Sequence, residues 1–295
     1  MQILMNKIIL NIIIFFWKLL IRLPRSFQIK ISKILGVIIW TLPFNRNKYS
    51  KINIESCLKD FSNQNKTQIY RQNIIASGRI IFDTGISWFW SNKKINRSIN
   101  YEMIGEEKIL KEQQQKNGVL LIFKHSLHLE LDARLIGMNL EAYGVERSHN
   151  SKIFNDIQST GRNKSLLGSA DRREPIKFIR WLKNGKTVLY APDQDYGNKN
   201  SITVNFFGLP AATIKAPYKI LKSTKCKLYF VNSYIKKDKY FLEFEKLNLN
   251  ESSEKEFLQE LNIFIESKIR NHPHEYLWQH RRFKSTLGKE NFYGK

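Results

Sequence analysis

The densest group of residues that could do acid–base chemistry is FKHSLHLELDAR at residues 123–134. It places His125 and Glu130 directly behind the apolar run GVLLIF, which is typical of a buried strand. A helix is expected over 127–136, with Ser126 as its N-cap. Two helical residues five positions apart lie about 140° apart around the axis. His125 and Glu130 can therefore meet only if His125 precedes the helix.

This junction suits a base and the carboxylate that orients it. A carboxylate bonded to one imidazole nitrogen fixes the tautomer and leaves the other nitrogen free to accept a proton from a hydroxyl. Backbone N–H groups at the start of the helix could stabilise a developing oxyanion. We therefore predict that His125 is a general base and that Glu130 is its partner.

Other chemistry has less support from the residues. His128 and Asp132 lie four apart and could share a helical face, which we interpret as a solvated surface pair. The chain contains neither H-E-x-x-H nor G-x-S-x-G, so a zinc site and a serine nucleophile both lack a motif. No metal and no cofactor are expected. Cys57 and Cys226 have no ligand or disulfide spacing and are expected to be buried thiols.

The rest of the chain alternates helices and strands, which predicts an α/β fold with a mixed, mostly parallel sheet flanked by helices. In such sheets chemistry lies at the carboxyl ends of the strands, where we expect both 125–130 and 192–197. The other expected elements are a helix over 66–90; a helix opened by Pro175, lined by Ile176, Ile179 and Leu182 and ended by Gly185; strands over 188–190, 227–232 and 240–247; and a helix that starts at a capping box of Ser253 and Glu256 and is lined by Leu258, Leu261, Ile265 and Ile269.

The N-terminus predicts a membrane anchor. Residues 8–21 are apolar except for Asn11 and Lys18, and basic residues flank the run at Lys7 and Arg22. The run is shorter than the ~20 residues that span a bilayer comfortably, so it could span marginally or lie in the interface. A buried helix of the domain is the alternative. We divide the chain into an anchor over 1–23 and one catalytic domain over 24–295, with the apolar segment 34–42 lying on the membrane or on that domain.

The net charge of +23 and pI near 9.9 ask for an anionic partner: nucleic acid, a membrane surface or an acidic protein. The lysines are spread along the whole chain, so charge alone does not choose among these partners.

Several separate blocks of the sequence resemble the lipid A late acyltransferases, and most of all their lauroyltransferase branch. The blocks are GVLLIFKHSLHLELDARLIGM, GRNKSLL, YAPDQDYG, NFFGLPAAT and EYLWQHRRFK, in the family's order and approximate spacing. The resemblance implies a glycerolipid acyltransferase-like fold of the H-x4-D/E type. It also implies direct transfer of an acyl chain, here lauroyl, from acyl carrier protein to a hydroxyacyl chain of Kdo-bearing lipid IVA, at the cytoplasmic face of the bacterial inner membrane.

The same resemblance implies that Arg147, Arg162 and Asp193 belong to the site. The arginines suit the phosphates and Kdo carboxylates of the acceptor, although each could equally form a fold-supporting salt bridge. The basic segment QHRRFK could meet lipid headgroups or the acidic carrier protein, or be a solvated charge run. Two residues depart from the family pattern: His128 replaces a smaller polar residue and Glu146 precedes Arg147.

Two other functions remain open from the residues. A metal-dependent glycosyltransferase would use Asp193 and Asp195 as a D-x-D clamp on a nucleotide sugar, although both could instead shape the turn that follows Pro192. A basic nucleic-acid-binding protein would account for the charge, but its aromatic residues do not alternate with basic ones.

Overall fold

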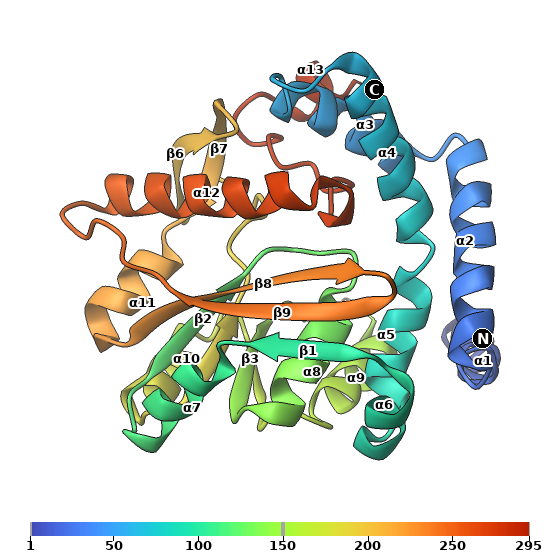
Figure 1. Cartoon of the computed structure of the whole chain (residues 1–295), viewed down its shortest axis with the longest axis horizontal. Helices are drawn as coiled ribbons and strands as arrows, with labels where there is room; N and C mark the ends of the chain where they lie inside the picture. The colour runs from blue at the N-terminus through green and yellow to red at the C-terminus, as the bar shows by residue number, and fades with distance from the viewer. Residues whose placement is uncertain (1, 149–150, 295) are drawn as a thin grey trace.

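The apolar run behind His125 forms the central strand of a seven-stranded sheet in the computed structural model, which describes residues 2–148 and 151–294 (Figure 1). The strand order is β1-β9-β8-β2-β5-β3-β4, and only β8 and β9 are antiparallel to each other. The predicted mixed, mostly parallel sheet is confirmed. Its strands are β1 (Tyr101–Ile104), β2 (Val119–Phe123), β3 (Ala142–Glu146), β4 (Ser169–Asp171), β5 (Thr187–Tyr190), β8 (Lys227–Lys236) and β9 (Lys239–Lys246); β6 (Ser201–Phe206) and β7 (Leu209–Ile214) form a separate hairpin.

Helices cover both faces of the sheet (Figure 1). Leu120 and Ile122 of β2 face a core shared with α10, α11 and α12, whereas Val119 and Leu121 face a core shared with α5, α7 and α8. All four side chains are fully buried. The helices are α1 (Gln2–Leu20), α2 (Arg25–Thr41), α3 (Asn45–Cys57), α4 (Asn63–Ser77), α5 (Ile80–Phe89), α6 (Asn92–Ser98), α7 (Glu106–Gln114), α8 (Leu129–Asn139), α9 (Lys152–Arg162), α10 (Pro175–Lys183), α11 (Ala216–Thr224), α12 (Glu254–Asn271), a 3₁₀ turn η1 (Pro273–Glu275) and α13 (Lys289–Tyr293).

Local signals predicted the C-terminal half well. The Ser253 hydroxyl caps α12 by accepting a hydrogen bond from the Glu256 N–H at 3.1 Å. The four apolar residues expected to line this helix are completely buried. Gly185 follows α10 with a φ of +74°, which a residue with a side chain rarely adopts. The two cysteines are free and buried, as expected.

The single helix predicted over 66–90 is wrong, because the chain breaks into α4 and α5 at Gly78. A Cβ at Gly78 would lie only 2.1 Å from the Ser32 carbonyl oxygen, so α2 approaches the backbone at this point. The break therefore follows from a tertiary contact that hydrophobic periodicity does not report. The prediction that Ile176 lines the buried face of α10 is also wrong, because Ile176 is 72% exposed and Phe178 is buried instead.

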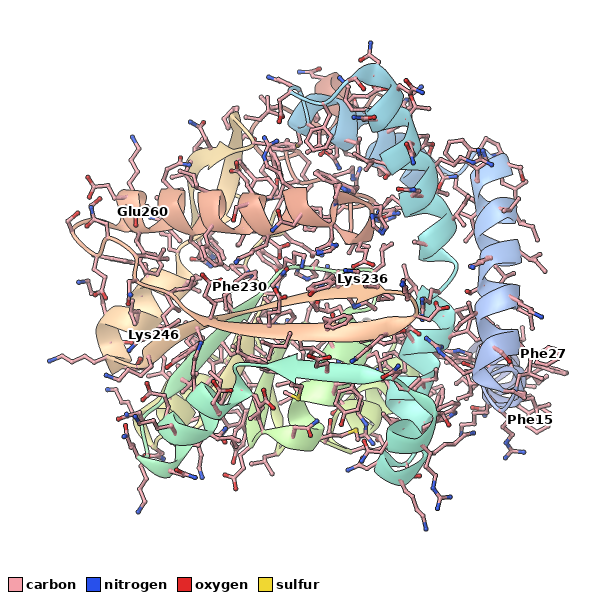
Figure 2. The ribbon with its side chains drawn as sticks, viewed as in Figure 1. Phe15, Phe27, Phe230, Lys236, Lys246 and Glu260 are labelled. Carbon is pink, nitrogen blue, oxygen red and sulfur yellow. The ribbon has the colours of Figure 1, made fainter. Side chains whose placement is uncertain are left out.

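The two N-terminal helices lie at one side of the molecule, with α2 beside α4 and α1 near the lower end of α2 (Figure 1). In Figure 2, Phe15 of α1 and Phe27 of α2 point away from the body of the protein. Among the described residues no single helix has both the length and the apolar composition to cross a membrane, and α2 and α3 reach them only as a pair bent by 86°. The expected anchor therefore remains a prediction; the side chain of Lys7 and residue 1 lie outside the described part. The exposed apolar residues, here called the N-terminal apolar surface, are Ile8, Ile9, Ile12, Ile13, Phe15, Phe16, Leu19, Phe27, Ile34, Val37, Ile38, Leu42 and Phe44.

Candidate active site

His125 leaves the carboxyl end of β2 in a backbone segment fixed by the C-terminal part of the chain. Its carbonyl accepts a hydrogen bond from the Leu277 N–H at 2.9 Å, and the Leu127 N–H donates to the Glu275 carbonyl at 2.9 Å. Between these two bonds Ser126 forms a β-bridge with Tyr276. The imidazole is therefore presented from a rigid, extended segment ahead of α8.

The carboxylate that holds this imidazole is Asp193, where the sequence analysis expected Glu130. Asp193 follows β5, the parallel neighbour of β2. One of its oxygens lies 2.5 Å from His125 Nδ1, and the other accepts the His125 backbone N–H at 2.9 Å. Burial by itself raises the pKa of Asp193, but the charge and hydrogen bonds of His125 lower it overall. A deprotonated Asp193 places a proton on Nδ1 and leaves Nε2 as the basic nitrogen.

Glu130 lies in the first turn of α8 and is held by different donors. Arg162 donates to its Oε1 at 2.5 Å and to its Oε2 at 3.1 Å, and the Trp88 indole N–H donates to Oε2 at 2.8 Å. Burial raises the pKa of Glu130, but Arg162 more than offsets this and lowers it overall. The charge of His125 also lowers that pKa, so the two groups interact electrostatically.

His125 and Glu130 line the same cavity, which has a volume of about 510 Å³. It opens at the carboxyl ends of β2, β3, β4 and β5, where the sequence analysis placed the chemistry. Three cationic side chains that line it, Arg147, Arg172 and Lys284, form no ion pair with a described residue. These cations face the cavity without a carboxylate of the described chain to neutralise them.

Arg162 differs from them because both edges of its guanidinium are occupied. Besides Glu130, it donates to Glu146 Oε2 at 2.6 Å. Glu146, the departure noted before Arg147, also accepts the Ser169 hydroxyl at 2.9 Å. The structure thus gives Arg162 the role of an internal salt bridge rather than of a free anion-binding group.

The start of α8 also differs from expectation. The helix begins at Leu129, and the residue before it is His128, so Ser126 is not the N-cap. The Ser126 hydroxyl instead donates to Asp132 Oδ2 at 2.7 Å. The buried carboxylate of Asp132 therefore takes the Ser126 hydroxyl away from the start of the helix.

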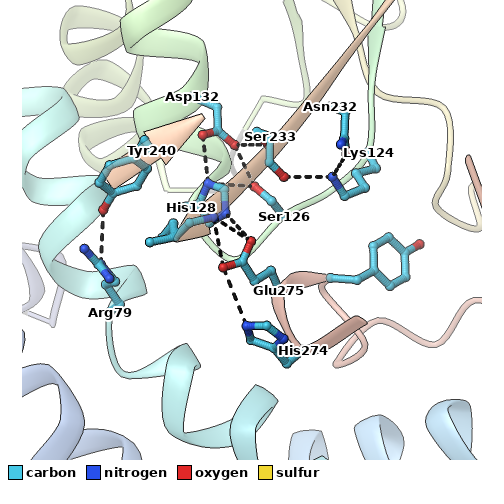
Figure 3. A network of polar contacts seen from close by, with 12 residues as sticks. Arg79, Lys124, Ser126, His128, Asp132, Asn232, Ser233, Tyr240, His274 and Glu275 are labelled. Carbon is cyan, nitrogen blue, oxygen red and sulfur yellow. Dashed lines mark hydrogen bonds and ion pairs between the residues drawn. The ribbon is translucent and has the colours of Figure 1, made fainter. Parts of the chain in front are cut away.

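His128 and Asp132 are buried, which makes the predicted solvated surface pair wrong. His128 Nδ1 lies 2.7 Å from Asp132 Oδ1, and its Nε2 lies 3.6 Å from Glu275 (Figure 3). Buried Lys124 extends the network by donating to Asn232 and to the Ser233 carbonyl at 2.6 and 2.8 Å. The network borders a second cavity of about 460 Å³. Within this segment His125 and Glu130 therefore face the first cavity, whereas Leu127 and His128 face the second.

Asp193 and Asp195 do not form the clamp that a nucleotide sugar would need. Asp193 is occupied by His125, and Asp195 accepts the N–H groups of Gly197 and Ser285 and the Ser285 hydroxyl at 2.7 to 2.9 Å. Asp195 therefore shapes its loop, the alternative left open from the sequence. No group of His, Cys, Asp and Glu side chains in the described part of the chain is arranged to hold a metal ion.

Sequence reasoning missed three cavity residues. Arg172 had no motif, whereas His280 and Lys284 belong to the basic segment QHRRFK. His280 Nε2 accepts the Asp195 N–H at 3.0 Å, and burial together with the charge of His125 lowers its pKa to about 3. Arg282 is 3% exposed and donates to the Ala212 carbonyl. The segment is therefore a wall of the site rather than a solvated charge run.

An open α/β sheet with an Asp–His pair at its strand ends, facing a cavity lined by cations, is an arrangement typical of an enzyme site. The chain belongs to the bacterial lipid A biosynthesis acyltransferases, whose family model matches residues 2–285. It is therefore an acyltransferase, as the resemblance implied.

Individual relatives agree with this assignment. The chain is 32% identical over 273 residues to a lipid A biosynthesis lauroyltransferase of Escherichia coli, covering 90% of this chain and 88% of the relative. It is 30% identical to a lipid A biosynthesis acyltransferase of Haemophilus influenzae, covering 81% and 78%. It is 28% identical to a lipid A biosynthesis palmitoleoyltransferase of Escherichia coli, covering 84% and 82%.

Proposed function

We propose that this enzyme transfers a lauroyl group from acyl carrier protein to a hydroxyacyl chain of Kdo-bearing lipid IVA, at the cytoplasmic face of a bacterial inner membrane. The observation that carries the proposal is the His125–Asp193 pair at the wall of a cavity that also presents Glu130 and three cations. The preference for lauroyl rests on the similarity to a lauroyltransferase, although a palmitoleoyltransferase is nearly as similar.

In the proposed mechanism, His125 Nε2 takes the proton of the acceptor hydroxyl while the oxygen attacks the carbonyl carbon of the thioester. Asp193 holds Nδ1–H and stabilises the imidazolium that forms. When the tetrahedral intermediate collapses, the C–S bond breaks and the imidazolium returns its proton to the leaving thiolate. Glu130 contributes a fixed negative charge across the cavity, which favours the same imidazolium.

The acceptor carries phosphates and Kdo carboxylates, so it needs cations that other carboxylates do not occupy. Arg147, Arg172 and Lys284 meet this requirement, and guanidinium groups bind such oxyanions with two parallel hydrogen bonds. Arg162 supports the site indirectly by fixing Glu130 and Glu146. Membrane binding is assigned to the N-terminal apolar surface, which would place lipid next to the catalytic domain.

The proposal is tested with purified protein, a panel of acyl carrier protein thioesters and Kdo-bearing lipid IVA, with the product read by mass spectrometry. We expect His125→Ala to lower kcat/KM by roughly 10²- to 10⁴-fold, the usual contribution of a general base. Asp193→Asn replaces the carboxylate beside His125 Nδ1 by a neutral amide, and we expect kcat/KM to fall about 10-fold or more. Glu130→Ala should abolish most activity as well.

The matched control is His274→Ala, which removes a partly exposed imidazole outside the catalytic cavity. It should retain nearly the wild-type rate. Wild-type protein that acylates no lipid A precursor with any thioester would exclude the proposed reaction, and normal turnover by His125→Ala would exclude the proposed base. Transfer of another chain length would change only the donor assignment.

A further inference from the structure

Trp88, at the end of α5, connects the N-terminal helix to the catalytic cavity. It is 3% exposed, and its indole N–H is the neutral donor on a carboxylate oxygen that also accepts from Arg162. That carboxylate belongs to Glu130. The neighbouring Ser87 holds the backbone of Glu130, because its hydroxyl donates to the Glu130 carbonyl at 2.6 Å. The end of α5 therefore holds Glu130 at two points.

The position of the Trp88 ring is itself fixed on two sides. Its ring lies 5.6 Å from that of Trp17 and 5.5 Å from that of Phe154, with edge-to-face geometry in both cases. On the α9 side, a Cβ at Gly161 would lie 2.6 Å from the Trp88 Cβ, so α9 approaches Trp88 as closely as a glycine allows. The indole has little room to move away from Glu130.

α1 forms one of these two sides, and it is built into the domain rather than attached to its surface. The Trp17 indole N–H donates to the Ile81 carbonyl at 2.8 Å. Gly85 permits this approach, because a Cβ there would lie 2.7 Å from Trp17 Nε1. Ile14 on the same helical face is 8% exposed and Ile21, directly after the helix, is 2% exposed, whereas the opposite face carries the α1 residues of the N-terminal apolar surface.

The charges explain why a neutral donor matters at this point. Arg162 donates to both oxygens of Glu130, and the indole N–H adds an uncharged donor from a different element to Oε2. The Trp88 hydrogen bond also helps, after Arg162, to lower the pKa of Glu130. Loss of the indole would therefore alter both the direction and the protonation of this carboxylate.

We infer that Trp88 is a positioning residue that holds the Glu130 carboxylate toward the catalytic cavity, and that α1 holds Trp88 through Trp17. This inference rests on the proposed function for its link to catalysis. It makes the N-terminal helix part of the scaffold of the active site as well as a membrane-binding segment. Removal of residues 1–23 should consequently slow chemistry even where membrane binding is not needed.

The test compares Trp88→Phe with Trp90→Phe in detergent micelles. Trp90 is equally buried and also ties α1 to the domain, by donating to the Ile21 carbonyl at 3.1 Å, but it does not contact Glu130. Trp88→Phe should lower kcat about 10-fold or more with KM nearly unchanged. Because Glu130 loses a donor that lowers its pKa, the acid limb of kcat/KM should move to higher pH. Trp90→Phe should keep the wild-type profile, and Trp17→Leu should share the defect of Trp88→Phe.

A second measurement does not depend on turnover. In protein with ¹⁵N-labelled tryptophan, Glu130→Gln and Trp17→Leu should both shift the Nε1–H resonance of Trp88, and Glu130→Gln should leave that of Trp90 in place. These shifts in a protein without acyl transfer would retain the positioning role and remove only the proposed reaction. An unmoved Trp88 resonance, or a Trp88→Phe enzyme with wild-type kcat and pH profile, overturns the inference.

Discussion

At the scale of single residues, the protein keeps two imidazoles three positions apart in opposite roles. His125 faces the catalytic cavity and is held on one side by Asp193. His128 is enclosed between Asp132 and Glu275 (Figure 3). Burial alone would lower the pKa of His128, but the two carboxylates raise it to about 10. A pKa in this range makes His128 a buried cation at neutral pH, and its charge contributes to stability.

The sign of the resulting pH dependence follows from that shift. The unfolded chain has a His128 pKa near 6.5, so its contribution to stability is complete below pH 6.5 and is lost as the pH rises toward 10. Between pH 7 and pH 9 the free energy of unfolding of the wild type should fall because His128 loses its contribution. In His128→Gln this fall should be smaller by about 2 kcal/mol. Urea denaturation at both pH values measures this difference.

The control for this prediction is His274→Gln, which changes a more exposed imidazole beside the same Glu275. It should lose stability with pH as wild type does. Lys124 contributes the opposite slope. Burial lowers its pKa to about 8, so the folded protein releases this proton before the unfolded chain does, and the free energy of unfolding rises with pH above 8. It is present in all three proteins and so cancels from the comparison. Equal slopes in wild type and His128→Gln would contradict a charged His128.

At the scale of elements, two glycines decide how α2 lies on α4. A Cβ at Gly36 would lie 2.0 Å from the Ile75 carbonyl oxygen, and one at Gly78 would lie 2.1 Å from the Ser32 carbonyl oxygen. Backbone atoms cannot yield as the end of a flexible side chain does. This close crossing fixes the helix that carries four residues of the N-terminal apolar surface: Phe27, Ile34, Val37 and Ile38.

We predict that Gly78→Ala lowers the free energy of unfolding by about 1 to 3 kcal/mol, the usual cost of overpacking. Gly168→Ala is the matched control, because its nearest neighbour is Tyr143 at an ordinary 3.5 Å. That variant should stay near wild-type stability. Thermal and urea unfolding of the two variants measure the difference, and an equally stable Gly78→Ala would show that α2 can move away from α4 at little cost.

At the scale of the whole molecule, apolar exposure is concentrated on α1, α2 and the residues that follow α2. These helices lie on one side, and α12 lies over the sheet with α4 between it and α2 (Figure 1). The net charge of +23 adds attraction to any anionic surface. Together the two features favour binding to an anionic lipid interface, with apolar residues giving the part that survives high salt.

We predict that replacing both Ile13 and Phe16 by serine weakens binding to anionic vesicles about 10-fold or more, since each side chain is more than half exposed on α1. Ile263→Ser is the control, because Ile263 is equally exposed at 55% but belongs to α12. Vesicle sedimentation at low and high salt measures both. If salt alone releases all three proteins completely, charge rather than apolar insertion holds them, and tighter binding to random DNA than to vesicles would favour the nucleic-acid alternative.

Features that depend on near neighbours in the chain were readable from the residues alone. Buried strands, the Ser253 cap, the turn at Gly185 and the place of His125 after β2 all follow from short-range patterns. The family resemblance, carried by blocks in register along the chain, was also readable and is confirmed.

The pairing of the charged side chains depends instead on contacts between distant parts of the chain. Asp193 reaches His125 because β5 lies next to β2, although 68 positions separate them in the chain. Glu130 is bound by Arg162 and Trp88, and His128 is buried against Glu275 of η1 and Tyr240 of β9. Spacing along one helix could not reveal these partners. A buried charge pairs with the opposite charge that folding brings nearest, because attraction is strong where the dielectric constant is low.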